Sequence, residues 1–304
     1  MTVLAVIGPT ASGKSAVALE AAAVRTAAGY PTEIVAVDAF TVYRGMDIAT
    51  AKPSVEDRRR IAHHLVDIVD PDTALTVAAF QAIAREVIEA ILARGATPLL
   101  VGGSGLYWRA VVDDLAFPPT DPDVRARIQA RWEDDVDEAH KHLAIEDPDA
   151  AAAIAPGNLR RIVRALEVIA LTSRPFSSFR TAFDRFDSIY DDLDVTLLDP
   201  PDNALKASIT RRADGMVAAG LLAEADRLRR TSLSVTARQA IGYAEAFAVL
   251  EGHMPQDELA VTIAQRTWRY ARRQRSWFRK DPRAVVRDRS AAARHLQTGG
   301  NDAV

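Results

Sequence analysis

The sequence predicts an α/β protein with a P-loop-type parallel sheet flanked by helices and a mainly helical insertion domain. Short apolar runs alternate with helical patterns over residues 3–101, which is typical of a parallel sheet. A glycine-rich loop, Gly8–Ser15, separates the first apolar run from the first helical pattern. We find no strand pattern over residues 117–194, and one returns at 195–198. The insertion therefore interrupts a sheet that is completed after it.

The first expected element is a buried strand over Val3–Ile7, and the loop after it has the spacing G-x-x-x-x-G-K-[ST]. Glycines let backbone N–H groups turn toward an anion, and the following helix adds the positive end of its dipole. We expect Lys14 to neutralise phosphate oxygens and the hydroxyl of Ser15 to hold Mg²⁺. The predicted diphosphate- or nucleotide-binding residues are Gly8, Pro9, Thr10, Ala11, Ser12, Gly13, Lys14 and Ser15.

The elements that follow continue the alternation. Residues 33–37 are predicted as a second strand, residues 77–94 as an amphipathic helix, and residues 98–101 as a third strand. Ligands of such sheets bind at the carboxyl ends of the strands. The predicted domains are a P-loop catalytic core of residues 1–116 and 195–289, a helical insertion domain of residues 117–194, and a flexible tail of residues 290–304.

Composition limits the class of protein. The chain has 304 residues, 48% of them hydrophobic and 26% charged, which suits a soluble protein of roughly two domains. It has no cysteine, so disulfides, thiolate zinc sites and cysteine nucleophiles are excluded. No apolar stretch approaches the ~20 residues of a membrane span, and the first residues lack the basic segment of a signal peptide. We therefore expect a cytoplasmic enzyme that contacts no membrane.

The net charge of −3 hides an uneven distribution. Acidic residues dominate residues 131–149, whereas basic residues dominate residues 265–283. The basic segment contains Arg266, Arg269, Arg272, Arg273, Arg275, Arg279, Lys280 and Arg283 against a single Asp281. Because a polyanion responds to the local potential more than to the total charge, RNA is not excluded as a partner.

Asp38 follows the second predicted strand directly, at the sheet edge where the phosphate-binding loop also opens. Three interpretations are compatible with this position. The carboxylate could accept a proton from a substrate, hold Mg²⁺ as an aspartate after an apolar strand often does, or cap the segment that follows. The spacing alone does not choose among them.

Further segments then follow in order along the chain. They are Tyr43–Pro53, His63–Ile68, Gly102–Tyr107, Arg160–Val168 and Arg238–Tyr243. Together with Gly8–Ser15, this series closely resembles the tRNA dimethylallyltransferases, the bacterial tRNA isopentenyl transferase family. The resemblance covers nearly the whole chain, from residue 3 to about residue 283. It implies transfer of a dimethylallyl group from dimethylallyl diphosphate to the exocyclic N6 amine of the adenosine immediately 3′ of a tRNA anticodon.

The resemblance also implies roles for individual residues. Asp38 would be the base that takes the N6 proton, and Thr10 would help to position the reacting groups. Arg212 would contact the diphosphate, with the neighbouring Arg211 as the alternative. Mg²⁺ would be the cofactor, and the loop would hold the leaving diphosphate instead of ATP. The residues implied to contact tRNA are Asp38, Ala39, Phe40, Thr41, Ser104, Arg125, Arg160, Arg161, Ile162, Val163, Arg164, Arg238, Gln239, Ala240, Ile241, Gly242 and Tyr243.

Other functions compete with this interpretation. Thr41 stands where many family members have an amide, and Ala49 where a glycine is common, so the contacts to the adenine stay open. The chain could be an adenylate isopentenyltransferase that uses free nucleotide, a small P-loop kinase with ATP in the loop, or a non-enzymatic RNA-binding module. The helical insertion and the arginine-rich segments favour a macromolecular acceptor. We expect the enzyme to be a monomer.

Overall fold

The computed structural model describes residues 2–179, 183 and 185–299, and the chain divides into two units. The first unit comprises residues 1–112 and 188–304, and the second comprises residues 113–187. The second unit thus starts four residues earlier and ends seven residues earlier than the predicted insertion of residues 117–194. A backbone hydrogen bond joins the points where the chain leaves and re-enters the first unit: the N–H of Ile189 donates to the carbonyl of Val112 at 2.9 Å.

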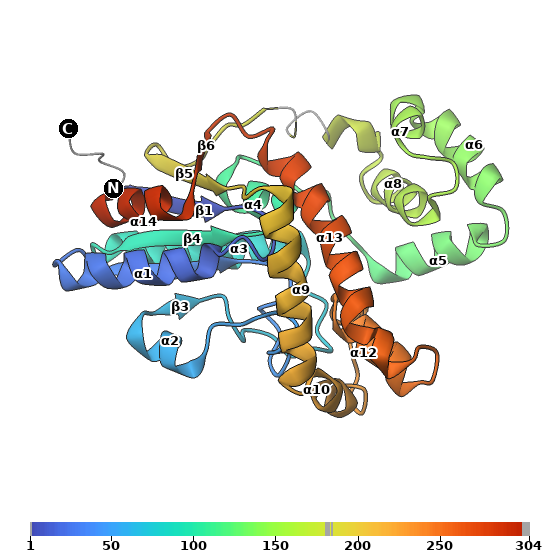
Figure 1. The fold of residues 1–304 in the computed structure, drawn as a ribbon. Helices are drawn as coiled ribbons and strands as arrows, with labels where there is room; N and C mark the ends of the chain where they lie inside the picture. The colour runs from blue at the N-terminus through green and yellow to red at the C-terminus, as the bar shows by residue number, and fades with distance from the viewer. Residues whose placement is uncertain (1, 180–182, 184, 300–304) are drawn as a thin grey trace. The chain divides into compact units, whose positions relative to one another are not determined.

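A six-stranded parallel sheet forms the centre of the first unit (Figure 1). Its strands are β1 (Val3–Ile7), β2 (Thr32–Val37), β3 (His63–His64), β4 (Thr97–Gly102), β5 (Leu193–Leu198) and β6 (Ala284–Arg287). Their spatial order is β3-β2-β4-β1-β5-β6. The predicted parallel α/β core is confirmed, and each strand expected from the sequence is present. The two edge strands, β3 and β6, were not predicted.

Helices cover both faces of this sheet because its strands are apolar on both sides. Val3, Ala5 and Ile7 of β1 pack with α3 (Val77–Ala93) and α4 (Gly105–Val112). The alternate residues, Leu4 and Val6, pack with α1 (Lys14–Ala27) and α14 (Arg289–Thr298). Figure 1 shows α1 and α14 side by side on their face of the sheet.

Helix α14 overturns the expectation of a flexible tail from residue 290. Leu296 is fully buried against α1, and the imidazole of His295 contacts the carboxylate of Asp194 on β5 at 2.7 Å. Asp288 caps the helix by accepting a hydrogen bond from the N–H of Ala291. The expectation was wrong because this short helix buries only a few residues, which gives a weak periodic signal in the sequence. Residues 300–304 lie outside the described residues.

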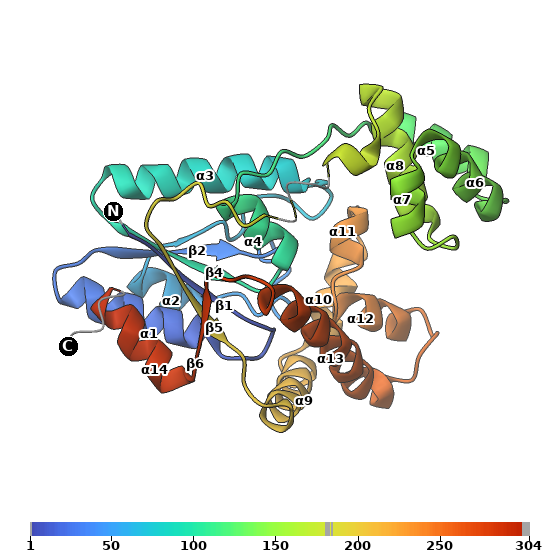
Figure 2. The same cartoon turned by 90° about the horizontal axis from the view of Figure 1, so that it is seen from above.

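The remaining helices of the first unit follow β2 and β5 in the sequence (Figure 2). Helix α9 (Asp202–Ala218) packs beside α13 (Leu259–Phe278), and the two lie side by side in both views. The shorter elements are α2 (Val55–Arg60), α10 (Leu221–Leu228), α11 (Val235–Arg238), α12 (Tyr243–Leu250) and the 3₁₀ helix η3 (Gln256–Glu258). In the part of the chain that the structure describes, no helix is long and apolar enough to span a membrane.

The second unit is helical where it is described. It consists of α5 (Pro122–Trp132), α6 (Val136–Glu146), α7 (Pro148–Ala153), α8 (Leu159–Thr172) and the 3₁₀ helix η1 (Phe176–Phe179). Aspartates cap three of these helices, and prolines occupy the first turn of α5 and α7, where a missing N–H has no cost. Ile162, Ala165 and Leu166 of α8 pack with Leu143 of α6 in its own core. The predicted helical insertion is confirmed.

Candidate active site

The phosphate-binding loop connects β1 to the first turn of α1 in the first unit. Two of its glycines are required by the geometry. Gly13 has φ 95°, a left-handed conformation that side chains disfavour. Gly8 has φ 149°, and a Cβ there would lie 2.3 Å from the carbonyl oxygen of Leu198 on β5. The loop can therefore pass this close to the neighbouring strand only with glycine at residue 8.

A cavity of about 180 Å³ opens beside this loop, at the carboxyl ends of β1, β2 and β4. It gathers many of the residues singled out in the sequence, although they are far apart along the chain. The polar residues that line it include Thr10, Lys14, Ser15, Asp38, Thr41, Arg212, Tyr270 and Gln274. Phe40, Ala240, Ile241, Ile209, Met216 and Ile263 contribute apolar surface. A cavity with apolar walls and a few convergent charged groups is the usual form of a small-molecule site.

Arg212 reaches the cavity from α9. Its Nη1 donates to the hydroxyl of Thr10 at 2.9 Å, and its Nη2 donates to the carbonyl oxygen of Ala49 at 3.3 Å. Its Nε is buried and has no hydrogen-bond partner. Burial lowers the pKa of this guanidinium, and the nearby carboxylate of Asp38 opposes that shift. The neighbouring Arg211 is exposed and does not line the cavity, so the structure places Arg212, and not Arg211, beside the loop.

Lys14 is the second cation of the site. Its Nζ donates to the carbonyl oxygen of Pro9 at 2.7 Å, which folds the side chain over the loop. Burial lowers the pKa of Lys14 to about 7, with a further lowering by the charge of Arg212 and an opposing effect of Asp38. Two cations side by side in a buried site repel each other, so a bound anion would relieve that repulsion.

Asp38 directly follows β2. Its negative charge acts on both cations, because it opposes the lowering of the pKa of Lys14 and of Arg212. Its Oδ1 accepts hydrogen bonds from the N–H groups of Phe40 at 2.8 Å and Thr41 at 3.3 Å. The carboxylate therefore does cap the turn that follows, which is one of the three interpretations from the sequence. The cap uses one oxygen, and Asp38 still lines the cavity, so capping is compatible with a role in proton transfer.

Tyr270 and Gln274 of α13 were not identified from the sequence as site residues. Gln274 is buried, its Oε1 accepts from the N–H of Thr10 at 2.9 Å, and its Nε2 donates to the carbonyl of Gly103. Burial and the charge of Asp38 raise the pKa of the Tyr270 hydroxyl, and hydrogen bonds to Gln274 and Ser104 oppose the shift. A glutamine and a tyrosine four residues apart face the same side of a helix, but nothing else in the sequence distinguishes them.

The other residues implied to contact tRNA occupy different environments. In the first unit, Phe40, Thr41, Ala240 and Ile241 line the cavity, and Ala39 and Ser104 are half-buried. Arg238 and Gln239 are exposed. Gly242 and Tyr243 are buried, so in this structure they contact protein and present no surface to a nucleic acid.

In the second unit, Arg160 and Arg161 are exposed on α8, whereas Ile162 and Val163 are buried. Arg125 and Arg164 both form ion pairs of 2.8 Å with Glu167, a carboxylate whose side chain is fully buried. Arg164 also donates to the carbonyl oxygens of Pro118 and Pro119. These two arginines therefore tie α5 and the preceding loop to α8.

The arginines of α13, together with Arg279 directly after it, are likewise of two kinds: some form ion pairs within the protein and others are exposed. Arg275 pairs with Asp199 at 2.6 Å, Arg279 pairs with the same carboxylate at 2.7 Å, and Arg266 pairs with Glu245. These arginines stabilise contacts between elements of the first unit. Arg269, Arg272 and Arg273 are exposed.

The donor atoms of the cavity fit a divalent cation only together with a ligand. Among the described residues no group of three or more His, Cys, Asp or Glu side chains could hold a metal ion. The hydroxyl of Ser15 and the carboxylate of Asp38 both line the cavity, and both are hard oxygen donors of the kind that Mg²⁺ prefers. Mg²⁺ commonly completes its ligands with phosphate oxygens and waters. The site therefore suits a metal that arrives with a phosphorylated substrate.

Comparisons with known proteins agree on one family. Residues 41–281 match the family model described as IPP transferase. The chain is 46% identical over 301 residues to the tRNA dimethylallyltransferase of Mycobacterium tuberculosis, covering 96% of this chain and 94% of the relative. It is 41% identical over 313 residues to that of Bifidobacterium longum subsp. infantis, covering 99% of this chain and 94% of the relative.

Solved structures give the same result. The full-length tRNA isopentenylpyrophosphate transferase of Bacillus halodurans superposes with a TM-score of 0.70 at 36% identity, covering 98% of this chain and 95% of that one. A eukaryotic dimethylallyltransferase acting on tRNA has the same fold, with a TM-score of 0.74 at 24% identity over 91% of this chain and 69% of that one. The chain belongs to the IPP transferase family.

Proposed function

We propose that this protein is a tRNA dimethylallyltransferase, which transfers a dimethylallyl group from dimethylallyl diphosphate to the N6 amine of the adenosine immediately 3′ of the anticodon. The observation that carries the proposal is the convergence of Thr10, Lys14, Asp38 and Arg212 on one cavity in a member of the IPP transferase family. The names of its relatives supply the acceptor, since they are tRNA dimethylallyltransferases.

The diphosphate would bind on the loop between β1 and α1. Thr10, Lys14, Ser15 and Arg212 line the cavity beside this loop, and the partnerless Nε of Arg212 offers one more donor. The helix dipole of α1 adds positive potential at the same place. These groups stabilise negative charge as it accumulates on the leaving diphosphate, which is where the transition state needs it.

Mg²⁺, when bound with the diphosphate, would neutralise part of the charge of the leaving group. The hydroxyl of Ser15 is the residue that we propose to hold it, because this side chain follows Lys14 in the first turn of α1 and lines the same cavity. Diphosphate oxygens and water would complete its ligands.

The chemical step exchanges one bond for another. The N6 nitrogen attacks C1 of the dimethylallyl group, the C1–O bond breaks, and its electron pair leaves with the diphosphate. The amine is a poor nucleophile because its lone pair is delocalised into the ring. It must also lose a proton, because the nitrogen of the product is neutral. Asp38 would accept that proton, and the proposal is supported by its second carboxylate oxygen, which is not used to cap the turn. The hydroxyl of Thr10, a residue of the loop, accepts a hydrogen bond from Arg212, and Thr10 lines the same cavity as Asp38.

A nucleoside beside the anticodon lies in a single-stranded loop, so it can leave its stack at a cost of only a few kcal/mol and enter a cavity in the protein. Phe40, Ala240 and Ile241 supply apolar wall for a base. Arg160 and Arg161, which are exposed on α8, are available for phosphate contacts along the RNA.

An assay that compares two acceptors, tRNA and AMP, separates the proposal from its alternatives. The protein is incubated with Mg²⁺ and dimethylallyl diphosphate labelled in the dimethylallyl group, and the label is followed with tRNA or AMP as the acceptor. The proposal predicts label in tRNA and none in AMP. Label in AMP alone would identify a transferase for free nucleotide, and ATP hydrolysis or phosphoryl transfer without prenyl transfer would identify a kinase.

A further inference from the structure

One short segment, Tyr43–Lys52, supplies the backbone oxygen that orients Arg212. The carbonyl of Ala49 accepts a hydrogen bond from Nη2 of Arg212, while Nη1 of the same guanidinium is bound to Thr10. A guanidinium is planar and rigid, so two hydrogen bonds fix the direction of its other N–H groups as well. One of these groups belongs to Nε, which is buried and has no hydrogen-bond partner. The place of the Ala49 carbonyl therefore decides where Nε points.

The residues directly before Ala49 are held by one buried carboxylate, Glu224 of α10, which is 4% exposed. Its Oε1 accepts from the N–H of Asp47 at 3.2 Å and from the N–H of Ile48 at 2.9 Å. The same oxygen accepts from the hydroxyl of Tyr243 at 2.5 Å. Burial and this carboxylate raise the pKa of Tyr243, which keeps its hydroxyl in the protonated, donating form. Hydrogen bonds to a buried charge are among the stronger ones in proteins.

Gly242, the residue before Tyr243, allows the close approach that these bonds need. It has φ 100°, and a Cβ at this residue would lie 2.6 Å from the Cβ of Ala49. The start of α12 is thus packed directly against the residue whose carbonyl holds Arg212. The segment Arg238–Tyr243, which the family resemblance links to RNA, ends in two residues that support this carbonyl from inside the protein.

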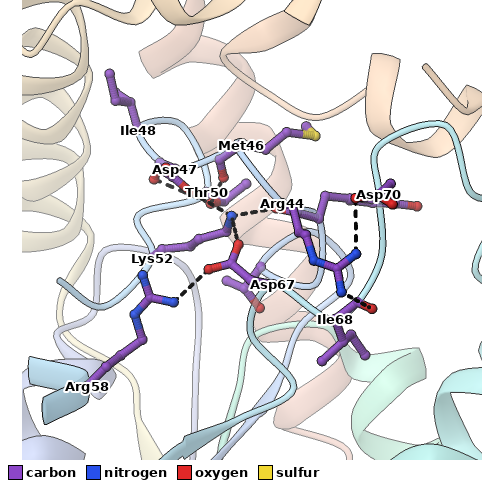
Figure 3. A network of polar contacts seen from close by, with 12 residues as sticks. Arg44, Met46, Asp47, Ile48, Thr50, Lys52, Arg58, Asp67, Ile68 and Asp70 are labelled. Atoms are coloured by element: carbon purple, nitrogen blue, oxygen red, sulfur yellow. Dashed lines mark hydrogen bonds and ion pairs between the residues drawn. The ribbon is translucent and has the colours of Figure 1, made fainter. Parts of the chain in front are cut away.

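A network of charged side chains holds the same segment by further contacts, as Figure 3 shows. The side chain of Lys52 is 2% exposed, and its Nζ contacts Asp67 at 2.5 Å, Asp47 at 2.7 Å and the carbonyl oxygen of Tyr43. Arg58 adds a second contact to Asp67 at 2.6 Å. This cluster holds both ends of the segment and the side chain of Asp47, whereas Glu224 holds the backbone N–H groups of Asp47 and Ile48, next to Ala49.

We infer that Glu224 and Tyr243 are positioning residues for diphosphate binding, acting through the Ala49 carbonyl on Arg212. The inference rests on the proposed function for the nature of its ligand, a diphosphate. Neither side chain lines the cavity, so each acts through the backbone of the Tyr43–Lys52 segment and not by touching the substrate.

Calorimetric titration with inorganic pyrophosphate and Mg²⁺ tests the inference without requiring prenyl transfer. Tyr243→Phe removes one hydrogen bond to the carboxylate and keeps the ring, and we expect it to weaken pyrophosphate binding by about tenfold. Glu224→Gln replaces the charged acceptor by an amide and should weaken binding by at least as much. Asp226→Asn is the matched control, because Asp226 lies on the same helix, pairs with Arg229 and Arg230 at the surface, and should leave binding unchanged.

The decisive readout is the dependence of these effects on Arg212. In an Arg212→Gln background, Tyr243→Phe should have no further effect on the affinity for pyrophosphate, because its route to the ligand is gone. An equal loss with and without Arg212 would overturn the inference and leave a purely structural role. Unchanged binding by both variants, or no pyrophosphate binding by the wild-type protein, would also overturn it. Pyrophosphate binding with the expected coupling but no prenyl transfer would overturn the proposed function alone.

Discussion

Arg212 donates a hydrogen bond to the hydroxyl of Thr10 at 2.9 Å, although 202 positions in the sequence separate the two residues. The bond joins the loop after β1 to α9, a helix that begins after the second unit has been inserted. Because the Nε of the same guanidinium is buried without a partner, the contact leaves one strong donor available beside the phosphate-binding loop. The cavity beside this loop is therefore assembled from both parts of the interrupted core.

Arg212→Gln should lower kcat/KM for dimethylallyl diphosphate by about 100-fold or more, because the variant loses the charge and the free donor that would stabilise the leaving group. Steady-state kinetics with saturating tRNA measure the effect. The matched control is Arg211→Gln, since this exposed neighbour does not line the cavity. Equal losses in the two variants would count against the assignment of Arg212.

Asp38→Asn should reduce the rate of prenyl transfer by about 100-fold while leaving tRNA affinity nearly unchanged. The amide keeps an oxygen that can accept from the N–H groups of Phe40 and Thr41, so the turn is preserved, but it cannot take a proton. Single-turnover rates and tRNA titrations measure the two quantities. Full turnover in this variant would place the proton acceptor elsewhere.

The lowered pKa of Lys14 predicts that diphosphate binding takes up a proton. Only the charged form of Lys14 attracts the anion, and in the empty site its pKa is about 7. The contribution of Lys14 to the affinity should therefore be largest below that pH and should fall by up to about tenfold for each pH unit above it. Calorimetry in buffers of different ionisation enthalpy reports the proton uptake directly.

The diphosphate itself titrates in the same pH range as Lys14, so its own contribution to the pH dependence must be measured. The Lys14→Met variant is the control, because it keeps the titration of the diphosphate and removes that of the lysine. The variant should bind more weakly at every pH and should show a shallower decline above pH 7. Parallel pH profiles of the two proteins would mean that the lysine is already charged in the empty site.

Two arginines of α8 should respond differently to substitution. Arg161 is exposed, so Arg161→Ala should weaken tRNA binding and reduce the slope of log affinity against log salt by about one. Arg164 is bound to Glu167 and to two carbonyls, so Arg164→Ala should lower the free energy of unfolding of the second unit by about 2 kcal/mol. Salt-dependent binding and thermal melting distinguish the two effects.

An unchanged salt slope for Arg161→Ala would show that this residue does not contact phosphate. A loss of salt dependence in Arg164→Ala without a change in melting would show that its contacts with Glu167 and the prolines contribute little. Arg160→Ala provides a second test of the same surface, because this residue is also exposed on α8.

The sheet and the phosphate-binding loop could be predicted because they have strong local signals. The apolar runs that became β1, β2, β4 and β5 are continuous, and Gly8 and Gly13 have backbone geometries that few other residues adopt. The strand β3 has two histidines and β6 has four residues, which is too little for a periodic pattern. Helix α14 was missed because few of its side chains are buried.

The residues of the candidate site could be predicted only where a chemically suitable side chain stands in a local sequence motif. Asp38 directly follows β2 and Lys14 lies at the end of the glycine-rich loop after β1, so both positions are visible in the sequence. Gln274 could not be found, because its importance comes from two backbone contacts with distant segments, at Thr10 and Gly103. The pairing of Arg164 with the buried Glu167 could not be predicted either. A run of basic residues on a helix does not show which of their charges are neutralised by a neighbouring carboxylate.

The mass of the nucleosides of tRNA tests the central claim most directly. The wild-type protein and Asp38→Asn are each incubated with unmodified tRNA, dimethylallyl diphosphate and Mg²⁺, and the digested tRNA is analysed by mass spectrometry. We predict N6-dimethylallyladenosine at the position immediately 3′ of the anticodon with the wild-type protein, and almost none with the variant in the same time. No prenylated adenosine in any tRNA, or equal amounts with both proteins, would contradict the account.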